Sequence, residues 1–166
     1  MKEFLIICSF IMLVSLKTPL ESVREQFLNI NNLEQAEGFI EQLKQGTTAE
    51  AKGYYAAMVF MKSRFVKNPF SKLKHFKQGK KILDQDIVEN PLNVEIRYIR
   101  YIMQKQIPNF LGYNDFISED FNVITQEMVN AKLDLALKKY ILNNMLLLES
   151  LKIEEKEKIE QTLDKL

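Results

Sequence analysis

The chain has 166 residues, of which 46% are hydrophobic and 27% charged, as is ordinary for one globular domain with a real core. Its formal net charge is +1, so no overall field steers it toward nucleic acid or an anionic membrane. The low content of glycine and proline, 5 and 4 residues, favours helices over a β-sandwich or barrel. The single cysteine, Cys8, excludes an intramolecular disulfide and a CxxC redox pair within this chain.

An apolar run at the start of the chain, residues 4–16, lies between Lys2 and Lys17. Its length suits the hydrophobic region of a secretory signal peptide and is shorter than the roughly 20 residues of a membrane-spanning helix. We therefore expect residues 1–18 to be a signal peptide, and the protein to be exported to the periplasm or the cell envelope. An acid in the basic start and the lack of an A-x-A cleavage site leave a second interpretation open, a buried first helix of a cytoplasmic protein.

Helix-start and helix-stop signals recur along residues 19–166, which we expect to form a single all-α domain. Ser, Thr, Asn or Asp precedes the apolar-periodic runs, and glycine or proline follows several of them. Apolar residues at spacings of three and four, such as Ala51, Tyr54, Tyr55 and Met58, support the assignment. The sequence predicts helices over residues 22–30, 33–45, 48–66, 71–89, 93–106, 116–129, 131–149 and 153–165.

Residues 79–91 have the spacing of the second helix of a tetratricopeptide repeat. Gly79 is the small residue, Leu83 the bulky residue four positions on, Asp86 the residue three further, and Pro91 the proline five beyond. The chain therefore resembles the tetratricopeptide-like superfamily over roughly one and a half repeats. This resemblance implies stacked antiparallel helical hairpins, in which the first helix of each hairpin lines a concave surface. Asp86 departs from the alanine usual at its position, and an irregular helical bundle remains the alternative.

Two further stretches, residues 93–97 (Asn-x-Glu-Ile-Arg) and 110–113 (Phe-Leu-Gly-Tyr), look like stretches of small bacterial exported helical proteins of no assigned function. This second resemblance agrees with export and implies no activity.

Gly79, in the first resemblance, is also a position where a neighbouring helix could approach closely.

Arg97, Arg100 and Gln104 fall on one stripe, roughly 60° wide, of a predicted helix whose remaining surface is mostly apolar. A helix that is apolar nearly all round lies inside a protein, so this polar stripe faces either a groove or a buried acid. One interpretation is a structural ion pair with Glu119 or Asp120, because a buried arginine without a partner is costly. The other is a binding site, in which the planar guanidinium groups hold a carboxylate of a peptide in a groove.

The apolar loop that follows offers Tyr113 as a fourth candidate binding residue. Pro108 ends the predicted helix, and Gly112 permits a turn with positive φ. Phe110, Leu111 and Tyr113 either plug the gap between two hairpins or form the rim of the groove, where the Tyr113 hydroxyl lies near the arginines.

The stretch from residue 62 to 81 holds eight bases and no acid, and it includes a candidate basic patch formed by Lys72, Lys74, Lys77, Lys80 and Lys81. Bases interleaved with aromatic residues are found where proteins bind nucleic acid or anionic membranes. Phe65, Phe70 and Phe76 fall on the apolar stripes of two predicted helices, so we expect them in the core and the lysines on the solvated face. With export, nucleic acid is not expected as a partner, and an anionic lipid surface or an acidic protein remains.

No catalytic, metal or cofactor site is expected. His75 is the only histidine of the sequence, which has no G-x-S-x-G motif, P-loop or G-x-G-x-x-G. We expect a noncatalytic helical-repeat binding or scaffold module that holds a protein or peptide segment in a groove beside Arg97 and Arg100. The alternatives are a peripheral membrane or envelope protein that uses the basic patch, and a small-molecule binder or enzyme with an all-α pocket at the same arginines.

Overall fold

The computed structural model describes residues 17–108 and 111–166, and over these residues the protein is all-α, as predicted. The apolar run 4–16 of the expected signal peptide lies outside the described residues. No helix within the described part is both long enough and apolar enough to cross a bilayer. The helices are α1 (Pro19–Gln26), the short 3-10 helix η1 (Phe27–Asn29), α2 (Leu33–Leu43), α3 (Ala49–Phe65), α4 (Pro69–Glu89), α5 (Val94–Gln106), α6 (Ile117–Glu127), α7 (Leu135–Leu146) and α8 (Ile153–Leu163).

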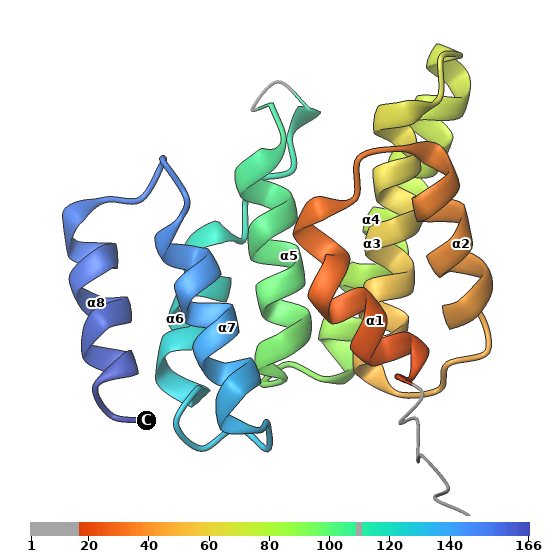
Figure 1. Ribbon diagram of the computed structural model, residues 1–166. Helices are drawn as coiled ribbons and strands as arrows, with labels where there is room; N and C mark the ends of the chain where they lie inside the picture. Colours follow the sequence, from red (N-terminus) through yellow and green to blue (C-terminus); the bar gives the residue numbers. More distant parts are fainter. Residues whose placement is uncertain (1–16, 109–110) are drawn as a thin grey trace, which may run out of the picture.

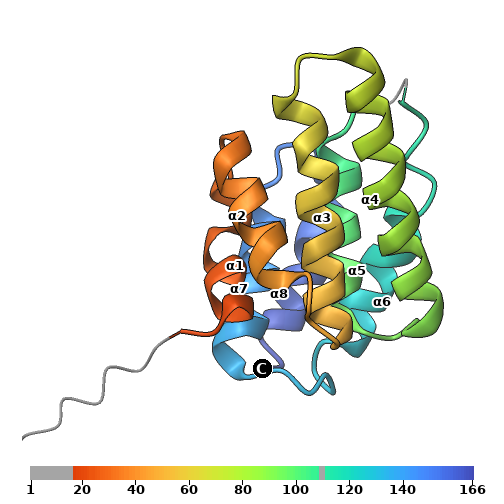
Figure 2. The ribbon, with the colours of Figure 1, turned by 90° about the vertical axis from the view of Figure 1, so that its right-hand side faces the viewer.

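The helices pack as neighbouring pairs, and the odd-numbered helices α1, α3, α5 and α7 contact one another in series (Figure 1). Each even-numbered helix packs against the helix before it, and α2 and α4 also contact the helix that follows. The α3–α4 hairpin is the longest, and in both views its connecting loop reaches furthest at one end of the molecule (Figures 1 and 2). The structure is therefore a bundle of helices with one protruding hairpin.

Side-chain caps explain most of the helix starts. Asn32 accepts a hydrogen bond from the backbone N–H of Gln35, as its predicted capping position requires. Thr18 and Glu21 form a capping box, so α1 begins before the predicted residue 22. The predicted start of α7 at residue 131 is wrong, because Asp134 caps the helix and delays its first residue to Leu135.

Backbone contact between α3 and α4 depends on a glycine. A Cβ atom built at Gly79 would lie 2.6 Å from Phe60 Cβ and 2.7 Å from the carbonyl oxygen of Ala56. These distances are too short for any side chain, so the close approach that the sequence predicted at Gly79 is confirmed. Gly53 likewise permits close packing of two helices, because a Cβ there would lie 2.9 Å from a methyl group of Ile96 on α5.

Asp86 is a buried carboxylate on the α4 side that faces the core. The Asn90 side chain donates to its Oδ1 at 3.2 Å, and its Oδ2 has no hydrogen-bond partner among the described residues. Burial raises the pKa of Asp86 to about 6. The folded protein therefore holds a proton on Asp86 more tightly than the unfolded chain does.

We expect Gly79→Ala to lower the free energy of unfolding by about 2 kcal/mol, because its methyl group would overlap the α3 backbone. Gly38→Ala is the matched control, since a Cβ at Gly38 on α2 meets nothing within 4 Å. That control should raise the free energy of unfolding by about 0.5–1 kcal/mol through the better helix propensity of alanine. Urea denaturation measures both, and equal effects of the two substitutions would contradict the close contact.

Asp86→Asn should stabilise the protein at pH 7 but not at pH 4. Protonated Asp86 stabilises the folded state. This stabilisation is fully present below the ordinary carboxyl pKa of 3.8 and is lost as the pH rises through the folded-state pKa of about 6. Over this window the wild-type protein should lose about 2–3 kcal/mol relative to Asp86→Asn. Denaturation curves of both proteins between pH 4 and 7 measure the difference, and parallel pH profiles would show that Asp86 titrates normally.

Candidate functional site

Six alternating charges run from α4 through α5 to α6, and we call them the charge ladder: Lys80, Asp84, Arg100, Asp120, Arg97 and Glu119. Three cations face three carboxylates, so the ladder carries no net charge. Its two ends reach solvent, while Arg100, Asp120 and Arg97 in the middle are buried. The ladder thus joins three helices through the interior.

Asp120 lies at the centre of the ladder and is completely buried. Arg100 donates two parallel hydrogen bonds to Asp120, from Nε to Oδ2 and from Nη2 to Oδ1, each 2.8 Å long. Arg97 donates from Nη1 to the same Oδ1 at 2.8 Å, and Gln104 donates from Nε2 to Oδ2 at 3.4 Å. This carboxylate is therefore saturated by hydrogen-bond donors from one face of α5.

The outer contacts of the two arginines complete their hydrogen bonding. Arg97 donates to Glu119 at 2.5 Å and, through Nε, to the carbonyl oxygen of Pro91 at 2.8 Å. Arg100 lies 4.3 Å from the centre of the Phe116 ring and donates to Asp84 at 3.3 Å. Burial lowers the pKa of Arg100, but the hydrogen bond and charge of Asp120 outweigh this effect and hold the pKa above its ordinary value.

Tyr113 contacts the ladder through its hydroxyl group, which donates to Asp84 Oδ1 at 2.9 Å. Its ring packs 6.0 Å from the ring of Phe60 and 6.1 Å from that of Phe76, and Lys80 Nζ lies 4.8 Å from its centre. Burial, together with the charge of Asp84, raises the pKa of Tyr113. Tyr113 therefore plugs the gap beside the α3–α4 hairpin, and Gly112 has the positive φ predicted for the turn, 62°.

The structure brings together all four predicted binding residues, Arg97, Arg100, Gln104 and Tyr113, but in the interior. Arg97 and Arg100 are only 5% and 3% exposed, and Gln104 and Tyr113 are also buried. The predicted ion pair with Glu119 or Asp120 is confirmed, since Arg97 contacts both acids. The expectation that the polar stripe of α5 lines an open groove needs correction: the first turn of α6 places both acids directly over the stripe.

Sequence reasoning missed the part played by Asp84. This carboxylate accepts hydrogen bonds from Lys80, Arg100 and Tyr113, which lie in three different segments of the chain. The spacing of Lys80 and Asp84, one helical turn, was the available signal for their contact. The contacts to Arg100 and Tyr113 depend on how α4 lies against α5, which no local pattern contains.

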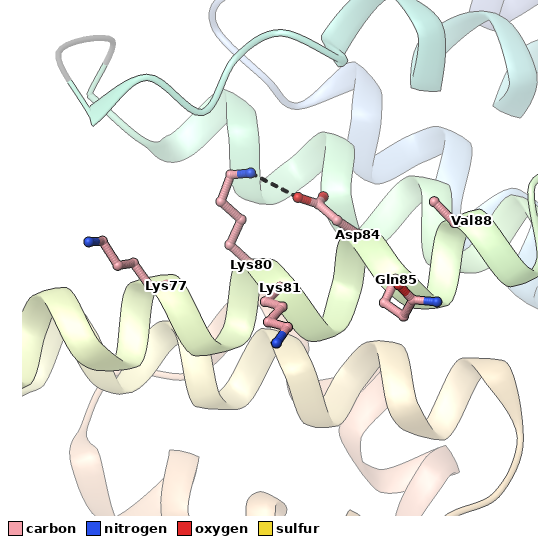
Figure 3. A pocket seen from close by; sticks show the side chains of 6 residues that line it. All are labelled: Lys77, Lys80, Lys81, Asp84, Gln85 and Val88. Carbon is pink, nitrogen blue, oxygen red and sulfur yellow. Dashed lines mark hydrogen bonds and ion pairs between the residues drawn. The ribbon is translucent and has the colours of Figure 1, made fainter.

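An open hollow lies on the outer side of α4, directly beside the charge ladder (Figure 3). It has a volume of about 420 Å³ and is lined by Lys77, Lys80, Lys81, Asp84, Gln85 and Val88. We call it the α4 hollow. The ion pair of Lys80 with Asp84 forms the edge that it shares with the ladder (Figure 3). Three lysines of the predicted basic patch therefore line this open surface of α4, while Lys72 and Lys74 lie toward the start of the helix.

The aromatic residues of the basic stretch do not share one environment. Phe76 packs against Phe60 at 4.8 Å, and Phe65 is partly buried, as expected for core residues. The expectation that Phe70 is also a core residue is wrong, because its exposed fraction is 84%. Phe70 lies in the first turn of α4, at the end of the protruding hairpin, where no other helix covers it (Figure 2).

Comparisons with protein-family models, curated proteins and solved structures found no match for this chain. Within the described residues, no group of three or more His, Cys, Asp or Glu side chains is placed to hold a metal ion.

We expect Arg100→Met to lower the free energy of unfolding by about 3–5 kcal/mol, because it removes the bidentate partner of the buried Asp120. Adding Asp120→Leu should recover part of this loss, since the uncompensated carboxylate is then gone. Lys17→Met is the control, because the Lys17–Glu25 pair at 2.7 Å is solvent-exposed.

Breaking such an exposed pair should cost less than about 1 kcal/mol. Guanidinium chloride denaturation of the single and double variants measures these differences. A double variant as unstable as the sum of its two single variants would contradict the coupling between Arg100 and Asp120.

Proposed function

We propose that the protein is a noncatalytic binding or scaffold module that holds an acidic segment of a partner protein in the α4 hollow, beside Arg97 and Arg100. The observation that carries this proposal is the chemistry of the hollow, which is lined by three lysines and one carboxylate. Asp84 is already occupied by Lys80, Arg100 and Tyr113. The remaining lysines leave the hollow with a positive charge that favours carboxylates of a partner.

Lys77 and Lys81 are the residues that we assign to partner contact. No ion pair involves either side chain among residues 17–108 and 111–166, and both are exposed. The exposed Val88 adds an apolar contact at the end of the hollow. Acidic side chains flanking one apolar residue would match this arrangement. The hollow is open to solvent over its whole length (Figure 3), which suits an extended segment better than an enclosed small molecule.

Arg100 is a positioning residue in this proposal rather than a contact of the partner, and Arg97 shares the Asp120 carboxylate with it. Arg100 holds Asp84, and Asp84 in turn holds Lys80 at the edge of the hollow. The buried ladder therefore limits the freedom of the side chains that line this edge.

The proposal includes a tetratricopeptide-like stack of hairpins. It is supported by the serial contacts of α1, α3, α5 and α7, and by the close approach of Gly79 to α3. The α4 hollow would then lie on a second helix of a hairpin, outside the concave surface that the first helices line in that family.

Export of the protein to the periplasm or the cell envelope is also part of the proposal. It is supported by the apolar run of residues 4–16 between two lysines. Sequencing the N-terminus of the mature protein from its native cells tests this part independently of binding.

A fluorescein-labelled peptide of alternating glutamate and leucine should bind the protein. Lys77→Gln combined with Lys81→Gln should lower the affinity for this peptide roughly fivefold. The control is Lys132→Gln combined with Lys139→Gln, which removes the same charge from exposed positions outside α4. Fluorescence anisotropy titrations at low and high salt measure the affinities, and binding should weaken as salt screens the lysines. Equal affinities of the two double variants would refute the α4 hollow as the site.

A further inference from the structure

The end of the α3–α4 hairpin carries two large apolar side chains in water. Phe70 is 84% exposed and Leu73 is 48% exposed. The connecting loop of this hairpin stands out beyond the other helices in both views (Figures 1 and 2). We call the region formed by Lys67, Phe70, Lys72, Leu73 and Lys74 the hairpin tip.

The local structure of the tip does not require an aromatic residue at position 70. The Asn68 side chain accepts hydrogen bonds from the backbone N–H groups of Phe70 and Ser71, and Pro69 occupies the first position of α4. These residues start the helix by themselves. The Phe70 side chain contributes no packing to this start, so its exposure calls for a different explanation.

The charged side chains of the hairpin tip itself all have the same sign, while Glu37 of α2 pairs with Lys62 on the neighbouring part of α3. Lys67, Lys72 and Lys74 are exposed, and no salt bridge involves them in the part of the chain that the structure describes. The stretch from residue 62 to 81 contains no acid that could neutralise them. The hairpin tip therefore combines an exposed aromatic residue with lysines that form no salt bridge among the described residues.

We propose that the hairpin tip docks on an anionic lipid surface. Phe70 and Leu73 enter the boundary between headgroups and acyl chains, and Lys67, Lys72 and Lys74 contact lipid phosphates. The tip is convex and small, so a protein partner would gain little buried area from it, whereas a fluid lipid surface closes around a convex apolar group. The docking is peripheral.

This inference concerns a different surface and a different partner from the α4 hollow. Phe70 and Val88, at the far end of the hollow, are separated by about five helical turns, or about 27 Å. Variants of one surface leave the side chains of the other unchanged, so failure of one proposal does not decide the other.

The experiment uses the absence of tryptophan from the sequence, which makes Phe70→Trp a single fluorescent probe at the tip. The full chain is titrated with vesicles of phosphatidylglycerol and phosphatidylcholine, and with vesicles of phosphatidylcholine alone. We expect the emission maximum of Phe70→Trp to shift to shorter wavelength only with the anionic vesicles, and high salt to reverse the shift. Val88→Trp, an exposed position at the other end of the same helix, is the control and should not shift.

In the Phe70→Trp background, Lys72→Gln combined with Lys74→Gln should lower the partition coefficient roughly fivefold for each charge removed. Lys132→Gln combined with Lys139→Gln should leave it unchanged within about twofold. The assignment is overturned if the Phe70→Trp emission stays at its value in buffer, if Val88→Trp shifts equally, or if neutral vesicles produce the same response.

Discussion

The buried carboxylate of Asp120 is the contact on which the arrangement of α4, α5 and α6 depends. It accepts hydrogen bonds from both Arg97 and Arg100, and Arg100 in turn reaches Asp84 on α4. The helices α4 and α6 make no close backbone contact with each other among the described residues, so the ladder connects them through α5. Burying these charges costs solvation energy that an apolar core would not. In exchange, each arginine joins two acids: Arg97 donates to Glu119 and Asp120, and Arg100 donates to Asp120 and Asp84.

The helices and the ion pair could be predicted from the sequence because both depend on local patterns. Apolar periodicity and capping residues set the helix bounds, and a buried arginine requires an acid on the next helix, here Asp120. Whether the polar stripe of α5 is open or covered could not be predicted. Whether Arg97 faces a groove or α6 depends on the angle between two helices, and the role of Asp84 depends on contacts between segments that are distant in sequence.

Phe70 illustrates a second limit of sequence patterns. Periodicity identifies which face of a helix is apolar, but it does not show how far along that face a neighbouring helix extends. Phe76 and Phe70 both satisfy the pattern, yet only Phe76 meets a partner ring, that of Phe60 on α3. The α3–α4 hairpin outreaches the neighbouring helices (Figure 2), and the first turn of α4 therefore remains uncovered.

One helix thus presents two surfaces of positive charge, and their spacing constrains how they can act together. Phe70 and Lys81 lie about 16 Å apart along α4, and Lys77 lies between them. Lys77 lies about 10 Å from Phe70 along the helix, slightly more than the Debye length of about 8 Å at physiological ionic strength, so a membrane that held the tip would act on Lys77 only through a screened field. Anionic lipid would then repel an acidic segment from the near end of the hollow and leave Lys81 and Val88 as its main contacts. With the tip free, both Lys77 and Lys81 would be available, so the two proposed binding events would be coupled weakly and negatively, and the coupling would weaken further as salt increases.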